Sequence, residues 1–438
     1  MKFKHWLALF VRCVLPCGLV TGAALADANV EVRYQQEIFA LKARADVSAA
    51  LDHVLTIAPR SRADLVELTE IPAPPFEEDQ RAERFAELLR EAGLQDVVID
   101  DVGNVIGRRS GTGANRTVAY SAHLDTVFPA GTDVTVKIDG DKLRAPGIGD
   151  NSRGLVVVLG VLRALQHAEI KTDADILFIG NVGEEGLGDL RGVKHLFRDG
   201  AEPINSLIAI DGGVTDRIVY GGVGSHRYRV TFVGPGGHSW GVFGTANPHH
   251  ALGRAIALFD EAALPITRSG AKSSYNVGRI GGGTSVNSVP FESWMEVDLR
   301  SGDLQKIDQL DAALQTAVQQ ALQEENAEKT RGDELTVEIR RVGTRPAAKG
   351  DPSSPLVQRA MAATLAYDLE PQLRISSTDA NLPISIGIPA ITMSRGGSGG
   401  GAHSLREWWR NDDGHLAIQI GILTLLAEAG LAEAALAD

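Results

Sequence analysis

The sequence predicts an α/β protein with two domains, one of which is inserted into the other. Its length of 438 residues exceeds what one hydrophobic core usually organises. In both outer parts of the chain, apolar strand-like segments alternate with helical ones, a pattern typical of a largely buried sheet covered by helices. A central stretch follows a different order of elements. The hydrophobic fraction of 44% and the charged fraction of 23% are ordinary for a folded protein and argue against disorder or a multispan membrane protein.

The outer parts of the chain carry the first domain, expected at residues 27–222 and 345–438. Residues 29–95 are mainly helical in pattern, although the Pro-rich segment 71–75 cannot continue a helix. We expect further strands at 97–99, 105–107, 117–122, 176–179, 207–210 and 390–393, and helices at 77–94, 155–167 and 416–429.

The central stretch 223–344 is expected to form the inserted domain. Its apolar patterns predict strands at 227–233, 274–280, 292–299 and 335–342, and helices at 248–263 and 303–328. The resulting order, β-α-β-β-α-β, is that of a ferredoxin-like fold.

Residues 1–26 have the three-part pattern of a secretory signal peptide: a basic start, an apolar stretch and the small-residue cleavage site Ala24-Leu25-Ala26. We expect cleavage before Asp27 and a periplasmic or secreted protein. The apolar stretch is shorter than the roughly 20 residues of a membrane-spanning helix, so no stable membrane insertion is expected after cleavage. Lipid attachment at Cys17 is the alternative, which the preceding Pro16 disfavours.

Composition limits the partners and the metal chemistry of the mature chain. Both cysteines, Cys13 and Cys17, lie in the predicted signal peptide, so a metal would have to be held by His and carboxylate side chains. Removal of the three basic residues of the signal peptide changes the formal charge from -13 to -16. Such an acidic surface disfavours nucleic acid as a partner.

Histidines and carboxylates recur at or just after predicted strands, where α/β domains build their sites. His123 and Asp125 occur in the segment SAHLDT, and we expect Asp125 to fix the tautomer of the His123 ring. Asp150 precedes the predicted helix 155–167. Taken singly, His123 has the alternative of a polar loop histidine and Asp150 that of a helix cap.

Three further segments add to this set. The adjacent pair Glu184 and Glu185 follows an apolar strand, and two such acids near a core favour cations beside them. Asp211 ends another strand, with a plain strand-end turn as the alternative. His403 follows the glycine-rich segment Gly396 to Gly401 and could, taken alone, be an ordinary loop residue.

Together the five segments have the ligand inventory of a hydrolytic site with two divalent metal ions. The four positive charges would be matched by Asp150, Glu185, Asp211 and a bridging hydroxide. Ligation by N and O atoms only suits catalytic Zn²⁺, which lowers the pKa of bound water to about 7, with Co²⁺ or Mn²⁺ as alternatives. Glu184 is left over as the proton acceptor.

The ordered motifs SAHLDT, GIGDNSRG, GNVGEEG, IAIDGG, GGHSW, NSVP and GGAHSLREW resemble the zinc exopeptidase and deacylase family. This family includes glutamate carboxypeptidase, tripeptide aminopeptidase, acetylornithine deacetylase and succinyl-diaminopimelate desuccinylase. The resemblance covers the chain from about residue 64 to its end. It implies a mixed-sheet, two-metal, aminopeptidase-like catalytic domain with an inserted lid domain that mediates homodimerisation.

The resemblance also implies a role for each matching residue. His123 and Asp211 would hold one metal ion, Glu185 and His403 the other, and Asp150 would bridge them. Glu184 would be the general base. His238 would reach the reacting carbonyl from the neighbouring subunit, Asn287 and Arg300 would grip the substrate, and Gly400 and Gly401 would add backbone donors.

One departure from the family pattern is Asn151, where many members have a second Asp. Because Asp150 remains to bridge, activity is still expected. Asp at position 211 resembles the peptidases more than the deacylases, so the sequence favours an exopeptidase of small peptides. A deacylase of N-acyl amino acids and a non-catalytic binding homologue are the alternatives.

Overall fold

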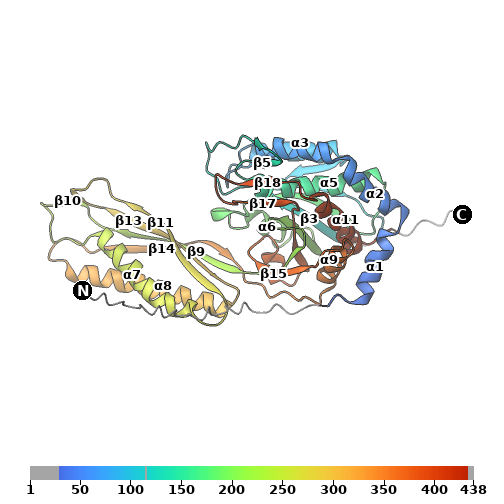
Figure 1. Cartoon of the computed structure of the whole chain (residues 1–438). Coiled ribbons are helices and arrows are strands. Elements are labelled where there is room, and N and C mark those ends of the chain that lie inside the picture. Colours follow the sequence, from blue (N-terminus) through green and yellow to red (C-terminus); the bar gives the residue numbers. More distant parts are fainter. Residues whose placement is uncertain (1–28, 114–115, 433–438) are drawn as a thin grey trace, which may run out of the picture.

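The computed structural model describes residues 29–113 and 116–432, which form a large lobe and a narrower lobe extending from it (Figure 1). The predicted signal peptide, residues 1–26, lies outside the described residues. Among the helices described, none is long and apolar enough to cross a membrane.

The large lobe is built on an eight-stranded mixed sheet with the order β1-β2-β6-β3-β7-β16-β8-β15. Its four central strands, β6, β3, β7 and β16, run parallel, so their carboxyl ends meet at one edge. The strands are β1 (Asp96–Ile99), β2 (Val105–Arg109), β3 (Thr117–His123), β6 (Asp175–Asn181), β7 (Ser206–Asp211), β8 (Arg217–Gly222), β15 (Gln372–Ser376) and β16 (Ala390–Ser394).

Helices cover both faces of this sheet. On one face, the nearly fully buried helices α5 and α11 pack against each other and form the main core with α1, α2 and α9. On the other face, a smaller apolar cluster joins strand residues to α6 and α10. The helices of this lobe are α1 (Val32–Lys42), α2 (Ala45–Thr56), α3 (Ala58–Thr69), α4 (Asp79–Glu91), α5 (Arg153–His167), α6 (Arg191–Leu196), α9 (Pro355–Leu365), α10 (Asn381–Ser385) and α11 (His415–Ala429).

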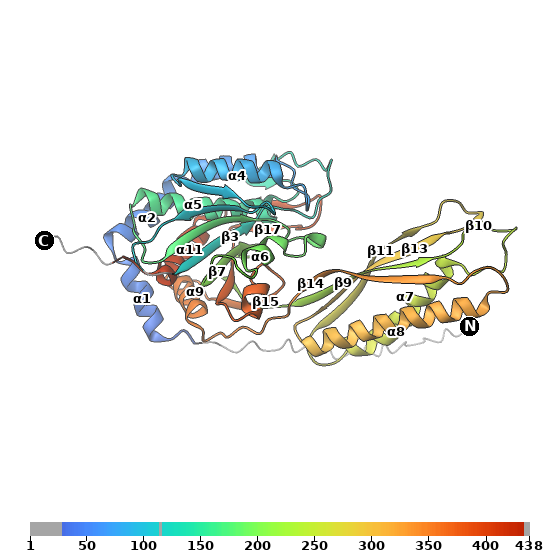
Figure 2. The same ribbon diagram turned by 180° about the vertical axis from the view of Figure 1, so that it is seen from behind.

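The narrower lobe, called the lid below, is an antiparallel sheet with the order β11-β13-β9-β14 and two helices on one side of it (Figure 2). Residues of β13 alternate between buried and half-buried, because one sheet face packs on the helices and forms a separate core. The elements are β9 (Gly224–Val233), α7 (Pro248–Thr267), β11 (Ser273–Gly282), β13 (Glu292–Ser301), α8 (Leu304–Glu328) and β14 (Thr336–Arg345).

The predicted fold class, an α/β domain with an inserted ferredoxin-like lid, is therefore confirmed, whereas the limits 223–344 given for the insertion stay a prediction. A short pair, β10 (Gly237–His238) and β12 (Ser288–Val289), lies at the lid end farthest from the large lobe (Figure 1).

A small four-stranded sheet lies beside the carboxyl edge of the main sheet and includes part of the glycine-rich segment. This small sheet was not predicted, and neither were β8, β15 and α9. Its strands are β4 (Lys137–Asp139), β5 (Lys142–Arg144), β17 (Ser398–Gly400) and β18 (Trp408–Arg410).

Candidate active site

The five predicted metal ligands converge at the carboxyl edge of the main sheet. His123 ends β3, Asp211 ends β7 and Glu185 follows β6. Asp150 lies in the short irregular turn η1 (Ile148–Ser152), which leads into α5, and His403 lies in a loop. The Nε2 atom of His123 lies 3.2 Å from Asp150 Oδ1 and 3.8 Å from Asp211 Oδ1. The Nε2 atom of His403 lies 3.2 Å from Asp150 Oδ2 and 2.9 Å from Glu185 Oε1. Asp150 thus turns one oxygen toward each histidine.

This donor set fits metal ions. Ligand atoms of His123, Asp150 and Glu185 all lie within 4.8 Å of one another. His123 Nε2 and Asp150 Oδ1 are buried and, although 3.2 Å apart, make no hydrogen bond of suitable geometry with each other or with any other described residue, which is rare for polar atoms in folded proteins. Hydrogen bonds to Asp150 and Glu185 raise the pKa of His403 to about 10, so the local field is strongly negative. A field that holds a proton on an imidazole also attracts a cation.

Asp125 contacts both the His123 ring and the backbone of Glu184 and Glu185. Its carbonyl oxygen accepts from Nδ1 of His123 at 3.0 Å, whereas its carboxylate Oδ1 lies 3.7 Å from that nitrogen. The carboxylate instead accepts the backbone N–H groups of Glu184 at 3.1 Å and Glu185 at 2.7 Å. In the structure, therefore, the carbonyl of Asp125 orients the His123 ring, and its side chain holds the turn that carries the two glutamates.

A second buried carboxylate, Glu407, holds the loop that carries Asp150. It accepts from the backbone N–H groups of Gly147 at 2.8 Å and of Gly149 and Asp150 at 2.9 Å each. Burial raises the pKa of Glu407 to about 7, although these donors act in the opposite direction. Glu407 was assigned no role from the sequence. Its position four residues after His403 was the one feature of the sequence that could have indicated a role in the site.

Asn151, at the position where many family members have an Asp, makes a hydrogen bond that an Asp could not make. It is buried, and its Nδ2 donates to the backbone carbonyl of Ile210 in β7 at 2.8 Å. A carboxylate at this position has no hydrogen to donate and would face that carbonyl oxygen with a like partial charge. Asn151 therefore ties the Asp150 loop to the strand that carries Asp211.

Glu184 is buried beside the cluster and is paired with a buried arginine. Its Oε1 lies 2.7 Å from Nη1 of Arg345, which also donates to Ser377 Oγ at 2.9 Å. Burial raises the pKa of Glu184 well above its usual value, while the positive charge of Arg345 acts against this rise. A carboxylate with a raised pKa is suited to accept a proton. Arg345 was not predicted, because no motif distinguishes it from other arginines of the chain.

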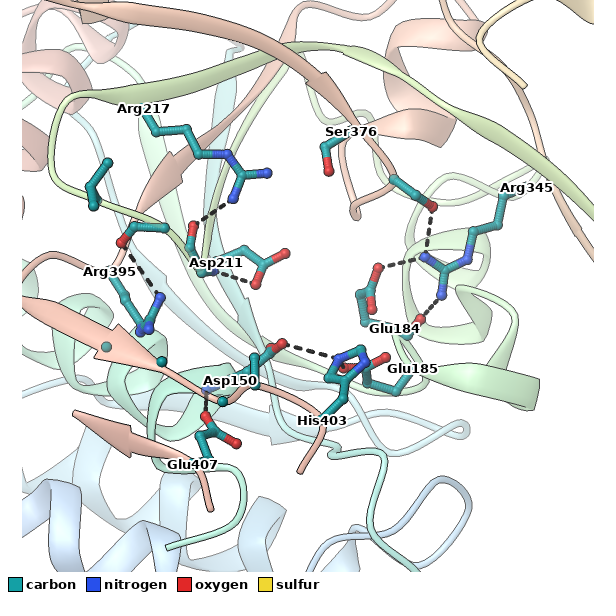
Figure 3. Close-up of a pocket in the computed structure, with 18 of the residues that line it drawn as sticks. Asp150, Glu184, Glu185, Asp211, Arg217, Arg345, Ser376, Arg395, His403 and Glu407 are labelled. Carbon is teal, nitrogen blue, oxygen red and sulfur yellow. Dashed lines mark hydrogen bonds and ion pairs between the residues drawn. The ribbon is translucent and has the colours of Figure 1, made fainter. Parts of the chain in front are cut away.

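A cavity of about 410 Å³ opens beside the cluster (Figure 3). Arg300, Gly400 and Gly401, three of the residues predicted to bind substrate, line it. The other residues that line it are Asp150, Glu184, Glu185, Asp211, Gly212, Gly213, Val214, Arg217, Arg227, Arg345, Ser376, Ser377, Arg395, Gly399, Ala402, His403 and Glu407.

His238 and Asn287 do not line this cavity. They lie together in the β10–β12 region of the lid, where the N–H of Ser239 donates to the carbonyl of Asn287 at 2.9 Å and both His238 and Asn287 are exposed. Within one chain the structure therefore does not bring these two residues to the predicted ligands.

The chain belongs to Peptidase family M20/M25/M40, whose family model matches residues 119–429. This defines the class of protein: a metal-dependent hydrolase that acts on peptide or acyl-amino acid amide bonds.

Individual relatives are distant. The chain is 26% identical over 322 residues to the uncharacterized protein YqjE of Bacillus subtilis, covering 72% of this chain and 82% of that one. It is 24% identical over 283 residues to carboxypeptidase G2 of a Pseudomonas species, covering 62% of each chain. Among solved structures, aminopeptidase PepT of Bacillus cereus matches with a TM-score of 0.64 at 22% identity, covering 85% of this chain and 99% of that one. The dipeptidase Dug1p of Saccharomyces cerevisiae matches with a TM-score of 0.70 at 15% identity, covering 87% and 98%. These structural matches establish the fold.

Proposed function

We propose that this metal-dependent hydrolase is an exported exopeptidase that cleaves small peptides with two bound Zn²⁺ ions. The observation that carries the proposal is the placement of Asp150 between His123 and His403, with one carboxylate oxygen toward each ring. A carboxylate in that position can bridge two ions that the histidines hold separately. Glu184 lies buried in the same cavity and is free of any ligand role in this arrangement.

Each ion would be held by one histidine, one carboxylate and the shared Asp150. His123 and Asp211 would hold the first ion, and His403 and Glu185 the second. When bound, such ions supply Lewis acidity toward the carbonyl oxygen and lower the pKa of water. The donor set consists of nitrogen and oxygen only, which supports zinc, with cobalt or manganese able to occupy the same ligands.

Glu184 would act as the general base. It takes a proton from the attacking water as the new C–O bond forms, and gives it to the amine nitrogen as the C–N bond breaks. The ion pair at 2.7 Å between Arg345 Nη1 and Glu184 Oε1 orients the carboxylate and leaves Oε2 for the proton. The raised pKa that burial gives Glu184 suits a group that must hold the proton between the two steps.

Turnover of substrates by wild type and by Glu184→Gln tests this function. Wild type loaded with zinc should hydrolyse dipeptides or tripeptides faster than N-acetyl amino acids. Glu184→Gln should lower kcat by a factor on the order of 100 or more and retain its metal content, because only proton transfer is removed.

Glu185→Gln is the matched control, since it alters the neighbouring carboxylate and should lower metal content as well as activity. Full activity of Glu184→Gln would contradict the assignment of the base. Turnover confined to the N-acetyl set would instead favour a deacylase, the second candidate function. The similarity to succinyl-diaminopimelate desuccinylase of Corynebacterium glutamicum supports this candidate. The two chains are 26% identical over 238 residues, which cover 53% of this chain and 64% of that one.

Export of the protein is proposed from the signal-peptide pattern of residues 1–26 alone. The mature protein should begin at Asp27, which N-terminal sequencing of the protein from its native host would detect. An N-terminus at Met1 would contradict export by this route.

A homodimer that assembles through the lid would complete the site. The lid end that carries His238 exposes large apolar side chains, with Trp240 88% and Phe243 85% exposed. Apolar groups gathered on one surface are typical of a contact with another subunit. In this arrangement His238 of one subunit would stabilise the developing charge on the carbonyl oxygen in the other.

Subunit mixing tests the contribution of His238 across the dimer. Dimers of His238→Ala and dimers of Glu184→Gln should each be nearly inactive. After the two are mixed and exchanged, about a quarter of wild-type activity should return, because half of the dimers then contain one intact site. If His238 acted within its own chain, no activity would return on mixing.

A further inference from the structure

Arginine is unusually frequent around the cavity, and most of these side chains have a carboxylate partner. Arg345 pairs with Glu184 at 2.7 Å. Asp298 accepts from two others, Arg227 at 3.0 Å and Arg300 at 2.6 Å. The arginines that line the cavity are Arg217, Arg227, Arg300, Arg345 and Arg395.

Arg217 and Arg395 differ from the other three. Neither lies within ion-pair distance of a carboxylate in the described part of the chain, and each bonds only to backbone carbonyls. Nη1 of Arg217 donates to Gly212 O at 3.1 Å, and Nη1 of Arg395 to Gly213 O at 3.5 Å. Arg395 is only 7% exposed, and its buried Nε has no partner. Arg217 is half-buried. A guanidinium that is partly or fully removed from water without a counter-charge is unfavourable, most strongly for Arg395, so the two side chains are suited to an anion that enters the cavity.

Glycines leave room for both side chains. A Cβ atom on Gly399 would lie 2.4 Å from Nη2 of Arg395, and one on Gly213 would lie 2.8 Å from Cδ of Arg217. Both distances are too short for a Cβ atom unless the arginine side chain shifts, so the two glycines allow the arginines to lie where they do.

Carboxylates at this end of the cavity are already engaged. Glu407 accepts three backbone N–H groups, and Asp211 accepts the N–H of Gly212 and is a proposed metal ligand. Neither provides the missing counter-charge at ion-pair distance. The partner must then come with the substrate.

The positions of Arg217 and Arg395 in the cavity indicate which half of the substrate they would contact. Figure 3 shows Arg217 and Arg395 to the left of Asp150, with His403, Glu184 and Arg345 to its right. In the proposed mechanism Glu184 gives its proton to the leaving amine, so the amine half of the substrate would lie toward Glu184 and the acyl half toward Arg217 and Arg395.

We infer that Arg217 and Arg395 form a carboxylate-binding subsite for the acyl half of the substrate. The preferred substrates are then amides whose acyl half carries a negative charge, namely peptides with an acidic first residue or amides of dicarboxylic acids. Two guanidinium groups can bind a carboxylate through charge-assisted hydrogen bonds. This inference rests on the proposed amide hydrolysis at the same site.

Matched substrate pairs that differ by one charge test the subsite. The pairs are N-succinyl-alanine with its side-chain amide N-succinamoyl-alanine, and the dipeptide Glu-Ala with Gln-Ala. Wild type should prefer the charged member by about tenfold or more in kcat/KM, as loss of a charge-assisted hydrogen bond implies. Arg217→Gln should bring this ratio close to one. Arg340→Gln, which changes an exposed arginine of the lid, should keep the wild-type ratio.

Binding measured by calorimetry separates failure of the subsite from failure of the hydrolase. Succinate should bind wild type about tenfold more tightly than it binds Arg217→Gln or Arg395→Gln, and Arg340→Gln should keep the wild-type affinity. If no amide is hydrolysed, the proposed function fails, and the affinity for succinate still decides the subsite. An unchanged affinity for succinate in Arg217→Gln would overturn the inference. Thermal unfolding checks that the buried Arg395→Gln remains folded, and Arg217→Gln decides the case if it does not.

Discussion

Mutual repulsion among carboxylates is the constraint on which the site depends. Asp150, Glu184, Glu185 and Asp211 all line one cavity, and two of them, Glu184 and Glu185, are buried. Such a group of negative charges is unfavourable unless positive charge lies among them. Arg345 neutralises Glu184. The other three face the two histidines, an arrangement that becomes favourable when cations bind between them.

Hydrogen bonds from the backbone to two further carboxylates hold the repelling side chains in place. Asp125 accepts two N–H groups from the turn of Glu184 and Glu185, and Glu407 accepts three from the loop of Asp150. In both cases a carboxylate outside the proposed ligand set accepts hydrogen bonds from the backbone of the segment that carries a proposed ligand. The parallel strands bring these turns to one edge of the sheet, and the second layer of carboxylates then sets their orientation.

Sequence reasoning found the parts of the site that follow strands with strong apolar patterns. His123 and Asp211 end the buried strands β3 and β7, so their approach follows from the parallel sheet. Arg345 and Glu407 were not predicted, because their partners lie 161 and about 260 residues away and no local pattern marks such contacts. The edge strand β15 was missed because Leu373 is its one buried residue, which leaves no apolar alternation to detect.

The number of ions that the protein binds tests the account most directly. Metal-free protein titrated with zinc, followed by calorimetry and by metal analysis after dialysis, should bind two ions per chain. Asp150→Ala should lose both at the same zinc concentration, because its two oxygens face both histidines, at 3.2 Å each. Wild type that binds no zinc, or Asp150→Ala that still binds two ions with wild-type affinity, would contradict the central claim that this carboxylate joins two metal ions.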